Sequence, residues 1–156
     1  MKKILKLFHN FLLTWKPIPL CWWFEKHNWK IPKYLIGKSA PTVTTQNCTD
    51  ILDTTATGNG NVTDVGAGYS AVTSRGICYM VGTSGDPTTA NSKVQEDGSF
   101  AAGAFTRSLT GLTGSTGYRV RAYAINATGT GYGATVQLTT LKTYVSGGVV
   151  ASIIII

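Results

Sequence analysis

The sequence is poor in the side chains that most enzymes use. Only 13% of its 156 residues are charged, and it contains three cysteines and two histidines. Both histidines, His9 and His27, lie in the first 40 residues, so residues 41–156 hold no Ser–His or Cys–His pair for nucleophilic catalysis. No Cys-x-x-Cys or Cys/His metal spacing and no calcium-loop pattern occurs either. We therefore expect a protein that is not an enzyme and has no catalytic, cofactor-binding or metal-binding residues.

The sequence also lacks a long apolar run and a convincing export signal. Lys2 and Lys3 precede an apolar stretch, as in a signal peptide, but His9 and Asn10 interrupt that stretch. No small-residue cleavage site follows before Pro17. The stretch is too short and too interrupted to span a membrane. We therefore expect that this segment does not direct secretion.

The few charges divide the chain into two chemically different parts. Residues 1–40 hold eight lysines and one acidic residue, Glu25, which gives a net charge of +7. Residues 41–156 hold six basic and six acidic residues, which cancel. All four tryptophans also lie in residues 1–40. The sequence predicts a basic, Trp-rich anchoring arm over 1–40, a domain over 41–141 and an apolar tail over 142–156.

Apolar residues near the start of the arm recur at helical spacing. Ile4, Phe8, Phe11 and Trp15 fall on one side, which predicts a short amphipathic helix that ends at Pro17. About forty residues with nothing to pack on cannot build a core, so another surface must cover the arm. The expected anchors are its large aromatic residues: Phe8, Phe11, Trp15, Trp22, Trp23 and Trp29.

Four surroundings are open for the arm. We favour docking onto protein neighbours, because tryptophans are effective anchors at protein interfaces. Lysines mixed with tryptophans also suit a membrane surface. Contact with nucleic acid, through lysines and stacked tryptophans, is a weaker alternative and is not our expectation. The arm could instead pack on its own domain.

Residues 41–141 show the two-residue alternation of half-buried strands. Within residues 118–124, the apolar parity holds Tyr118, Val120, Ala122 and Ala124, and the other holds Arg119, Arg121 and Tyr123. A turn at 126–129 and a second alternating run at 132–138 complete a hairpin. Earlier strands are expected at 42–45, 54–64, 71–81, 93–95 and 100–109. This spacing predicts an all-β antiparallel sandwich.

Four motifs within this region resemble a known family. They are TTATGNGNVTD, SRGICYMV, DPTTANSK and, most specifically, SLTGLTGSTGYRVRAYAINATGTGYG. Residues 41–141 are similar to fibronectin type III-like domains of the immunoglobulin-like group. The similarity is strongest to the Thr/Gly-rich version of phage structural proteins and Bacteroidetes-type surface proteins. The resemblance implies that Leu112 and Tyr118 form the structural tyrosine corner, in which the tyrosine hydroxyl bonds to nearby backbone.

Two features of the domain leave alternatives open. Arg107 shares its parity with Phe105 and Leu109, so either a bulge resets the register or Arg107 lies across the surface with its stem packed. Cys48 and Cys78 could form a bridge between neighbouring strands. We favour two buried free thiols.

The parity that holds Arg119, Arg121 and Tyr123 is predicted to face outward. These residues could form a binding stripe on an exposed sheet face. We favour a solvated face, because scattered polar residues on an outer face need no special explanation.

The tail has the composition of a strand that needs cover. After a hinge at Gly147-Gly148 it reads VVASIIII, which is β-branched and uncharged. Such a segment is an aggregation hazard when exposed, and strand addition to a neighbouring sheet edge would cover it. The expected anchors are Ile153, Ile154, Ile155 and Ile156.

These features together predict a virion structural protein, a component of a phage capsid, tail or fibre that presents the sandwich domain. Its expected partners are other structural proteins of the same assembly, including copies of itself, and the arm could also touch a membrane surface. The alternative is a bacterial cell-surface or extracellular adhesion or filament module, which needs an export route that the sequence does not show. A carbohydrate-binding domain would need an exposed aromatic platform, for which the domain offers Tyr69, Tyr79, Tyr123 and Tyr132.

Overall fold

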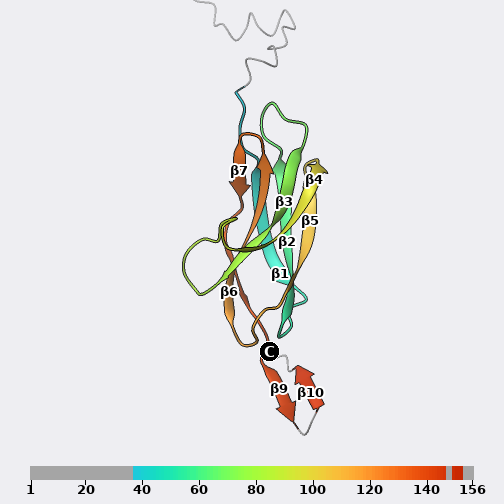
Figure 1. Ribbon diagram of the computed structural model, residues 1–156, viewed down its shortest axis with the longest axis vertical. Coiled ribbons are helices and arrows are strands. Elements are labelled where there is room, and N and C mark those ends of the chain that lie inside the picture. Colours follow the sequence, from blue (N-terminus) through green and yellow to red (C-terminus); the bar gives the residue numbers. More distant parts are fainter. Residues whose placement is uncertain (1–36, 147–148, 153–156) are drawn as a thin grey trace, which may run out of the picture. The chain divides into compact units, whose positions relative to one another are not determined.

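The computed structural model describes residues 37–146 and 149–152. The predicted helix of the arm, its six aromatic anchors and the four terminal isoleucines lie outside the described residues. The described residues form ten strands (Figure 1). Their bounds are β1 Thr42–Thr49, β2 Thr55–Asp64, β3 Val72–Val81, β4 Ser92–Phe100, β5 Gly103–Thr110, β6 Gly117–Asn126, β7 Gly129–Tyr132, β8 Val136–Thr139, β9 Thr143–Ser146 and β10 Val149–Ser152.

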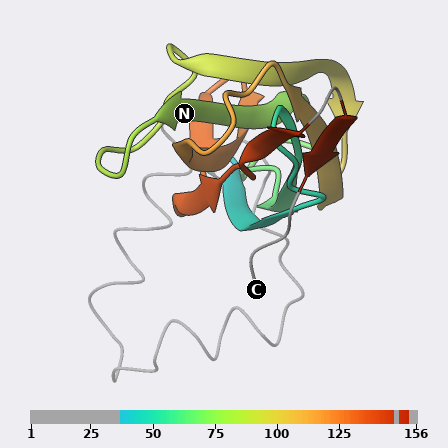
Figure 2. The same cartoon turned by 90° about the horizontal axis from the view of Figure 1, so that it is seen from below.

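Strands β1 to β8 form two antiparallel sheets that face each other (Figures 1 and 2). The first, which we call sheet A, has the order β1-β2-β5. The second, sheet B, has the order β4-β3-β6-β7, and β8 also pairs with β6. Every pairing in both sheets is antiparallel. The predicted all-β antiparallel sandwich is confirmed.

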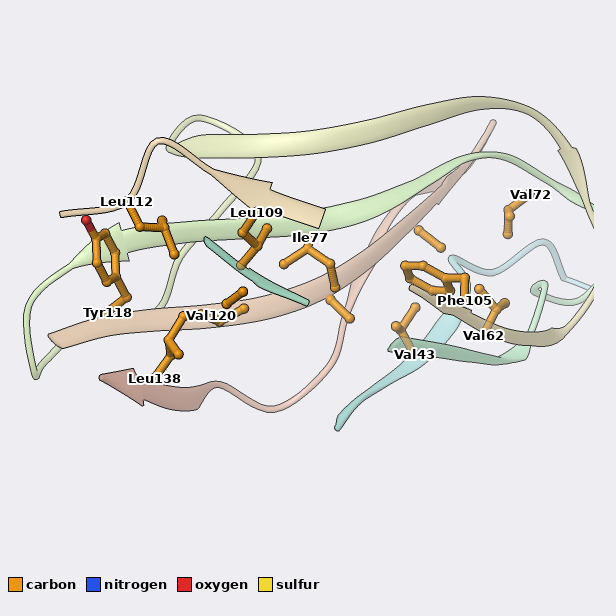
Figure 3. Close-up of a cluster of buried hydrophobic side chains, with 13 residues drawn as sticks. Val43, Val62, Val72, Ile77, Phe105, Leu109, Leu112, Tyr118, Val120 and Leu138 are labelled. Carbon is orange, nitrogen blue, oxygen red and sulfur yellow. The ribbon is translucent and has the colours of Figure 1, made fainter. Parts of the chain in front are cut away.

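The core lies between the two sheets and is built by the alternating apolar residues (Figure 3). On β6 the predicted inward parity is confirmed, since its four members are all buried: Tyr118, Val120, Ala122 and Ala124. Burying each large apolar side chain contributes roughly 1.5–3 kcal/mol. Gly60 of β2 lets the sheets approach, because a Cβ there would come within 2.6 Å of the Phe105 ring and 2.8 Å of Ala122 Cβ.

Strand β4 is longer than the sequence pattern indicates. The expected short strand at 93–95 is a nine-residue edge strand, and Phe100 ends it rather than beginning the next strand. Most of its side chains are exposed and polar, as at Lys93 and Asp97. Because an exposed edge strand buries little, it carries no clear apolar alternation to predict it.

The last strand of the predicted hairpin is also divided. The run 132–138 was expected to keep one parity inward, but residues 133–135 separate β7 from β8. Tyr132 pairs with Tyr123 on the outer face of sheet B, whereas Leu138 pairs with the buried Tyr118 on the inner face. The interruption therefore changes which parity faces the core.

Strands β9 and β10 form a separate two-stranded antiparallel sheet. Val149 pairs with Ser146, and Val150 pairs with Val145. Part of the predicted apolar tail thus folds back on itself as a hairpin. An isolated two-stranded hairpin is marginally stable in water, so this segment gains most from a further surface to pack on.

Candidate functional site

Leu112 and Tyr118 lie together at one end of the core (Figure 3). The Tyr118 hydroxyl accepts a hydrogen bond of 2.8 Å from the backbone N–H of Thr113, and both Leu112 and Tyr118 are buried. The Tyr79 ring packs edge-on against the Tyr118 ring, with 6.2 Å between centroids. This pair fixes the connection between β5 and β6 and so has a structural role.

On the outer face of sheet B, Arg119, Arg121 and Tyr123 form neither a solvated surface nor a free binding stripe, so this expectation was wrong. Tyr123 is fully buried although it points away from the core between the sheets. Its hydroxyl donates to Gln95 Oε1 at 2.9 Å, and its ring lies 6.3 Å from the Tyr132 ring. A Cβ on Gly76 would come within 2.7 Å of the Tyr123 hydroxyl oxygen. Because Gly76 has no side chain, there is room for the Tyr123 ring beside the backbone of β3.

The β3–β4 loop, residues 82–91, packs against this face and is drawn in green at the left of Figure 1. Its Pro87 is fully buried. The backbone N–H of Thr89 donates to the Tyr132 hydroxyl at 3.1 Å. Arg119 Nε donates to the carbonyl of Gly85 at 3.0 Å. The residues expected to face solvent therefore hold a loop of the same domain.

Two further contacts complete this loop attachment. Thr135 donates to Asp86 Oδ1 at 2.6 Å, and this bond, with Arg121 and Arg119 nearby, holds the pKa of Asp86 below its usual range. Arg121 Nε donates to the carbonyl of Gly133 at 2.6 Å, and its guanidinium lies 4.7 Å from the centre of the Tyr132 ring. Both arginines of β6 are thus engaged inside the domain.

Arg107 points toward the inner face of β5 without a bulge. The register between β2 and β5 is continuous and places Arg107 opposite Gly58, so the bulge alternative was wrong. Arg107 forms an ion pair with Glu96 of β4, and Arg75 Nε bonds to the same carboxylate at 3.2 Å. Desolvation, together with nearby Arg75, lowers the pKa of Arg107. Inward-pointing charges of this kind protect an open sheet edge from pairing with other strands.

Cys48 and Cys78 are free thiols, so no bridge joins them. Cys78 is fully buried and donates to the carbonyl of Arg121 at 3.3 Å, whereas Cys48 is half-buried. Burial raises the pKa of each thiol to about 11. Both thiols are therefore protonated and unreactive at neutral pH.

The outer face of sheet A differs from that of sheet B in having no charged or aromatic side chain on its strands. We call this surface the neutral face, and its ten residues are Thr44, Gln46, Thr55, Thr57, Asn59, Asn61, Ala104, Thr106, Ser108 and Thr110. The register aligns Thr44 with Asn61 and Ala104, and Gln46 with Asn59 and Thr106. Gln46 has the longest side chain of the neutral face, and the other nine residues are threonine, serine, asparagine or alanine.

The tyrosines do not form an exposed platform for carbohydrate. Tyr123 is buried, and Tyr69, Tyr79 and Tyr132 are half-buried. The Tyr69 hydroxyl is hydrogen-bonded to Thr128 at 2.8 Å. The four rings therefore serve the packing of the domain.

Within residues 37–146 and 149–152, no group of three His, Cys, Asp or Glu side chains is placed to hold a metal ion. Within those same residues, no helix is long and apolar enough to cross a membrane.

The structural roles of two residues were hard to predict from the sequence. The Thr45 hydroxyl accepts a hydrogen bond from the backbone of β6, and the only sign of this role in the sequence is a threonine at an inward-facing position of β1. Asn126 is buried and donates to the carbonyls of Ser39 at 2.8 Å and Val65 at 2.9 Å. Its turn position was predicted, but its link to the segment before β1 was not.

The chain is similar in structure to several solved proteins. The sensor domain of the anti-sigma factor RsgI4 of Pseudobacteroides cellulosolvens is 15% identical, with a TM-score of 0.46, over 67% of this chain and 97% of that chain. The human fibronectin type-III domain of fibronectin type III domain containing protein 3 is 20% identical, with a TM-score of 0.47, over 68% and 91%. The structures similar to this chain thus include fibronectin type III domains, and its own strands form a two-sheet antiparallel β-sandwich.

The chicken CNTN1 FN1-FN3 domains are a further similar structure, 20% identical with a TM-score of 0.47, over 67% of this chain and 33% of that chain. No protein-family model matches the sequence, and no curated protein is detectably similar to it. The function of the domain is therefore inferred from its own residues.

Proposed function

We propose that this chain is a non-enzymatic structural protein of a virus particle, a component of a phage capsid, tail or fibre. In this proposal the fibronectin type III-like domain is a rigid body that is packed or displayed in the particle. The arm over residues 1–40 anchors it to neighbouring proteins, and the C-terminal segment joins a neighbouring copy. The location of the protein is then the virion.

The observation that carries this proposal is the division of chemistry along the chain. The net charge of +7 and all four tryptophans lie in residues 1–40, and residues 41–156 have no net charge. Inside the domain, Arg119 and Arg121 bond to its own carbonyl groups. The groups best suited to binding another molecule are thus concentrated in the arm.

The C-terminal segment supports the same proposal. Hairpin β9–β10 pairs with neither sheet A nor sheet B among the described strands, and the sequence continues into four isoleucines. Uncharged, β-branched segments are stabilised by pairing with another sheet and aggregate when left bare. A fixed neighbour in a particle would provide this cover.

N-terminal sequencing of the protein purified from particles tests the proposal against a cell-surface adhesion or filament module. We expect an intact Met1 and co-purification with assembled particles. Loss of about the first twenty residues, together with recovery from the cell envelope, would replace the virion proposal with the secreted alternative.

A further inference from the structure

The two outer faces of the sandwich are unequal. The outer face of sheet B packs against the domain's own β3–β4 loop, which buries Pro87 and lies close to Tyr132. The neutral face of sheet A has no such cover among the described residues, and Thr44, Thr106 and Ser108 are exposed. Sheet A therefore offers the more open of the two broad surfaces.

The side chains of the neutral face are suited to contact with the same face of a second copy of the chain. In a two-fold contact between identical chains, the same patch meets itself, so carboxylates would face carboxylates and lysines would face lysines. Hydroxyl and carboxamide groups both donate and accept hydrogen bonds, whereas a carboxylate only accepts and an ammonium only donates. A face built from threonine, serine, asparagine and glutamine is therefore chemically complementary to itself.

The neutral face also has free hydrogen-bonding capacity. Gln46 Nε2 donates to Thr44 Oγ1 at 3.3 Å, and Asn59 Nδ2 donates to the carbonyl of Asn47 at 2.8 Å. Within the described part of the chain, the side chains of Thr106 and Ser108 make no hydrogen bond. These groups can exchange water for a partner's groups without breaking contacts inside the domain.

From these observations we propose that the neutral face is a contact surface for a second copy of this chain, sheet A against sheet A. The proposal rests on the assembly role argued above and names the surface that orients neighbouring copies. The ten outward positions of the neutral face, two on β1 and four each on β2 and β5, cover roughly 300 Å². A stable interface needs roughly 800 Å² per partner, so this contact holds copies together only alongside the arm and the C-terminal segment.

The side of the sandwich near β4 and β5 is a weaker candidate for the same contact. Arg107 and Glu96 point inward there, and such inward charges oppose strand addition. Lys93 and Asp97 on β4 would also meet their own kind in a two-fold edge contact. The contact is therefore assigned to the face of sheet A.

The test measures self-association of the full chain by sedimentation velocity over a range of concentrations. Thr106→Lys and Thr44→Lys each place a lysine on the neutral face, opposite the same patch of a second copy. We expect each variant to need at least tenfold more protein for half-assembly than the wild type. Thr83→Lys is the matched control, since Thr83 is an exposed residue of the β3–β4 loop and its variant should assemble as the wild type does.

A mixing experiment separates a specific contact from general repulsion or misfolding. Thr106→Lys and Thr106→Glu chains, each checked for wild-type unfolding temperature, should assemble poorly alone and recover assembly when mixed. Unchanged assembly of both face variants, or no recovery on mixing, would overturn this contact. If the face variants assembled normally but deleting residues 1–40 abolished assembly, the proposed function would stand without the sheet A contact. A full chain that stays monomeric at every concentration would overturn the second copy as partner.

Discussion

The Thr45 hydroxyl of β1 accepts a hydrogen bond of 3.0 Å from the backbone N–H of Ala122 in β6. Strand β6 pairs with β8 up to Val120 and with β7 from Tyr123, so Ala122 lies at the interruption between them. The carbonyl of Ala122 accepts from the backbone N–H of Gly133 at 2.9 Å. Thr45 thus joins the two sheets where the strand ladder is broken.

Replacing Thr45 with valine should destabilise the domain, because it leaves the Ala122 N–H without its acceptor. We expect the free energy of unfolding in urea to fall by about 1–2 kcal/mol. Thr45→Ser keeps the hydroxyl and should recover most of that loss. Thr44→Val is a control on the exposed side of the same strand, and a change there as large as at Thr45 would contradict this role.

Replacing Tyr118 with phenylalanine should remove the hydrogen bond to the Thr113 backbone while the ring stays buried. We expect a loss of about 1 kcal/mol in the free energy of unfolding. Tyr69→Phe removes a hydroxyl that bonds only to the exposed Thr128 side chain, and it should cost less than about 0.5 kcal/mol. Equal losses in the two variants would argue against a structural role for the Tyr118 hydroxyl.

The buried thiols predict that stability falls at alkaline pH. Burial raises the pKa of Cys78 to about 11, and an unfolded thiol ionises near pH 8.5. Between these values the unfolded chain has released its proton and the folded chain has kept it, so the free energy of unfolding decreases as pH rises. Urea unfolding between pH 7.5 and 10 should show a shallower decrease for Cys78→Ser than for wild type.

The pH range of this measurement stops at 10 for a specific reason. Burial also raises the pKa of Tyr123 to about 12, so its contribution begins only where unfolded tyrosines ionise, near pH 10. Below pH 10 the difference between wild type and Cys78→Ser therefore reports the thiol. Parallel pH profiles would show that Cys78 is not protected from ionisation.

Arg107 and Glu96 should respond differently to neutral substitution. Arg107→Met removes one of two guanidinium groups that share a carboxylate, and it keeps both the packed stem and the Arg75–Glu96 pair, so we expect a change smaller than about 0.5 kcal/mol. Glu96→Gln leaves Arg75 and Arg107 without their shared partner and should cost about 1 kcal/mol, since the site is partly exposed. Urea unfolding measures both, and a larger loss from Arg107→Met would reverse this assignment.

The same Arg107→Met variant tests edge protection. Removing the inward charge should make the chain aggregate at lower concentration, although its free energy of unfolding is nearly unchanged. Light scattering against protein concentration measures this, with Lys93→Met on β4 as the comparison. If Arg107→Met aggregated at the same concentration as the wild type, the ion pair would not protect the sheet edge.

The sequence predicted the sandwich because its central strand alternates strongly. Tyr118, Val120, Ala122 and Ala124 share a parity on β6, and all four are buried. The full length of β4 was not predictable in the same way, because an exposed edge strand needs no buried parity. The pattern of a strand reports which side is buried and says little about a strand that buries neither side well.

The outer face of sheet B shows a different limit of pattern analysis. Tyr123 sits among arginines on the polar parity, yet it is fully buried near a loop that begins more than thirty residues earlier in the chain. Local alternation cannot show that a distant loop covers a face. The neutral face of sheet A was missed for a related reason, since its rows form only when the registers of three strands are known.

The most direct test of the account compares the full chain with residues 41–141, by sedimentation velocity with and without vesicles of anionic lipid. The account predicts that residues 41–141 are a folded monomer and that the full chain assembles without lipid, because the chain ends supply the strongest contacts. A full chain that stays monomeric and binds the vesicles in a salt-dependent way would contradict it. That result would make the arm an anchor to a membrane surface rather than to protein neighbours.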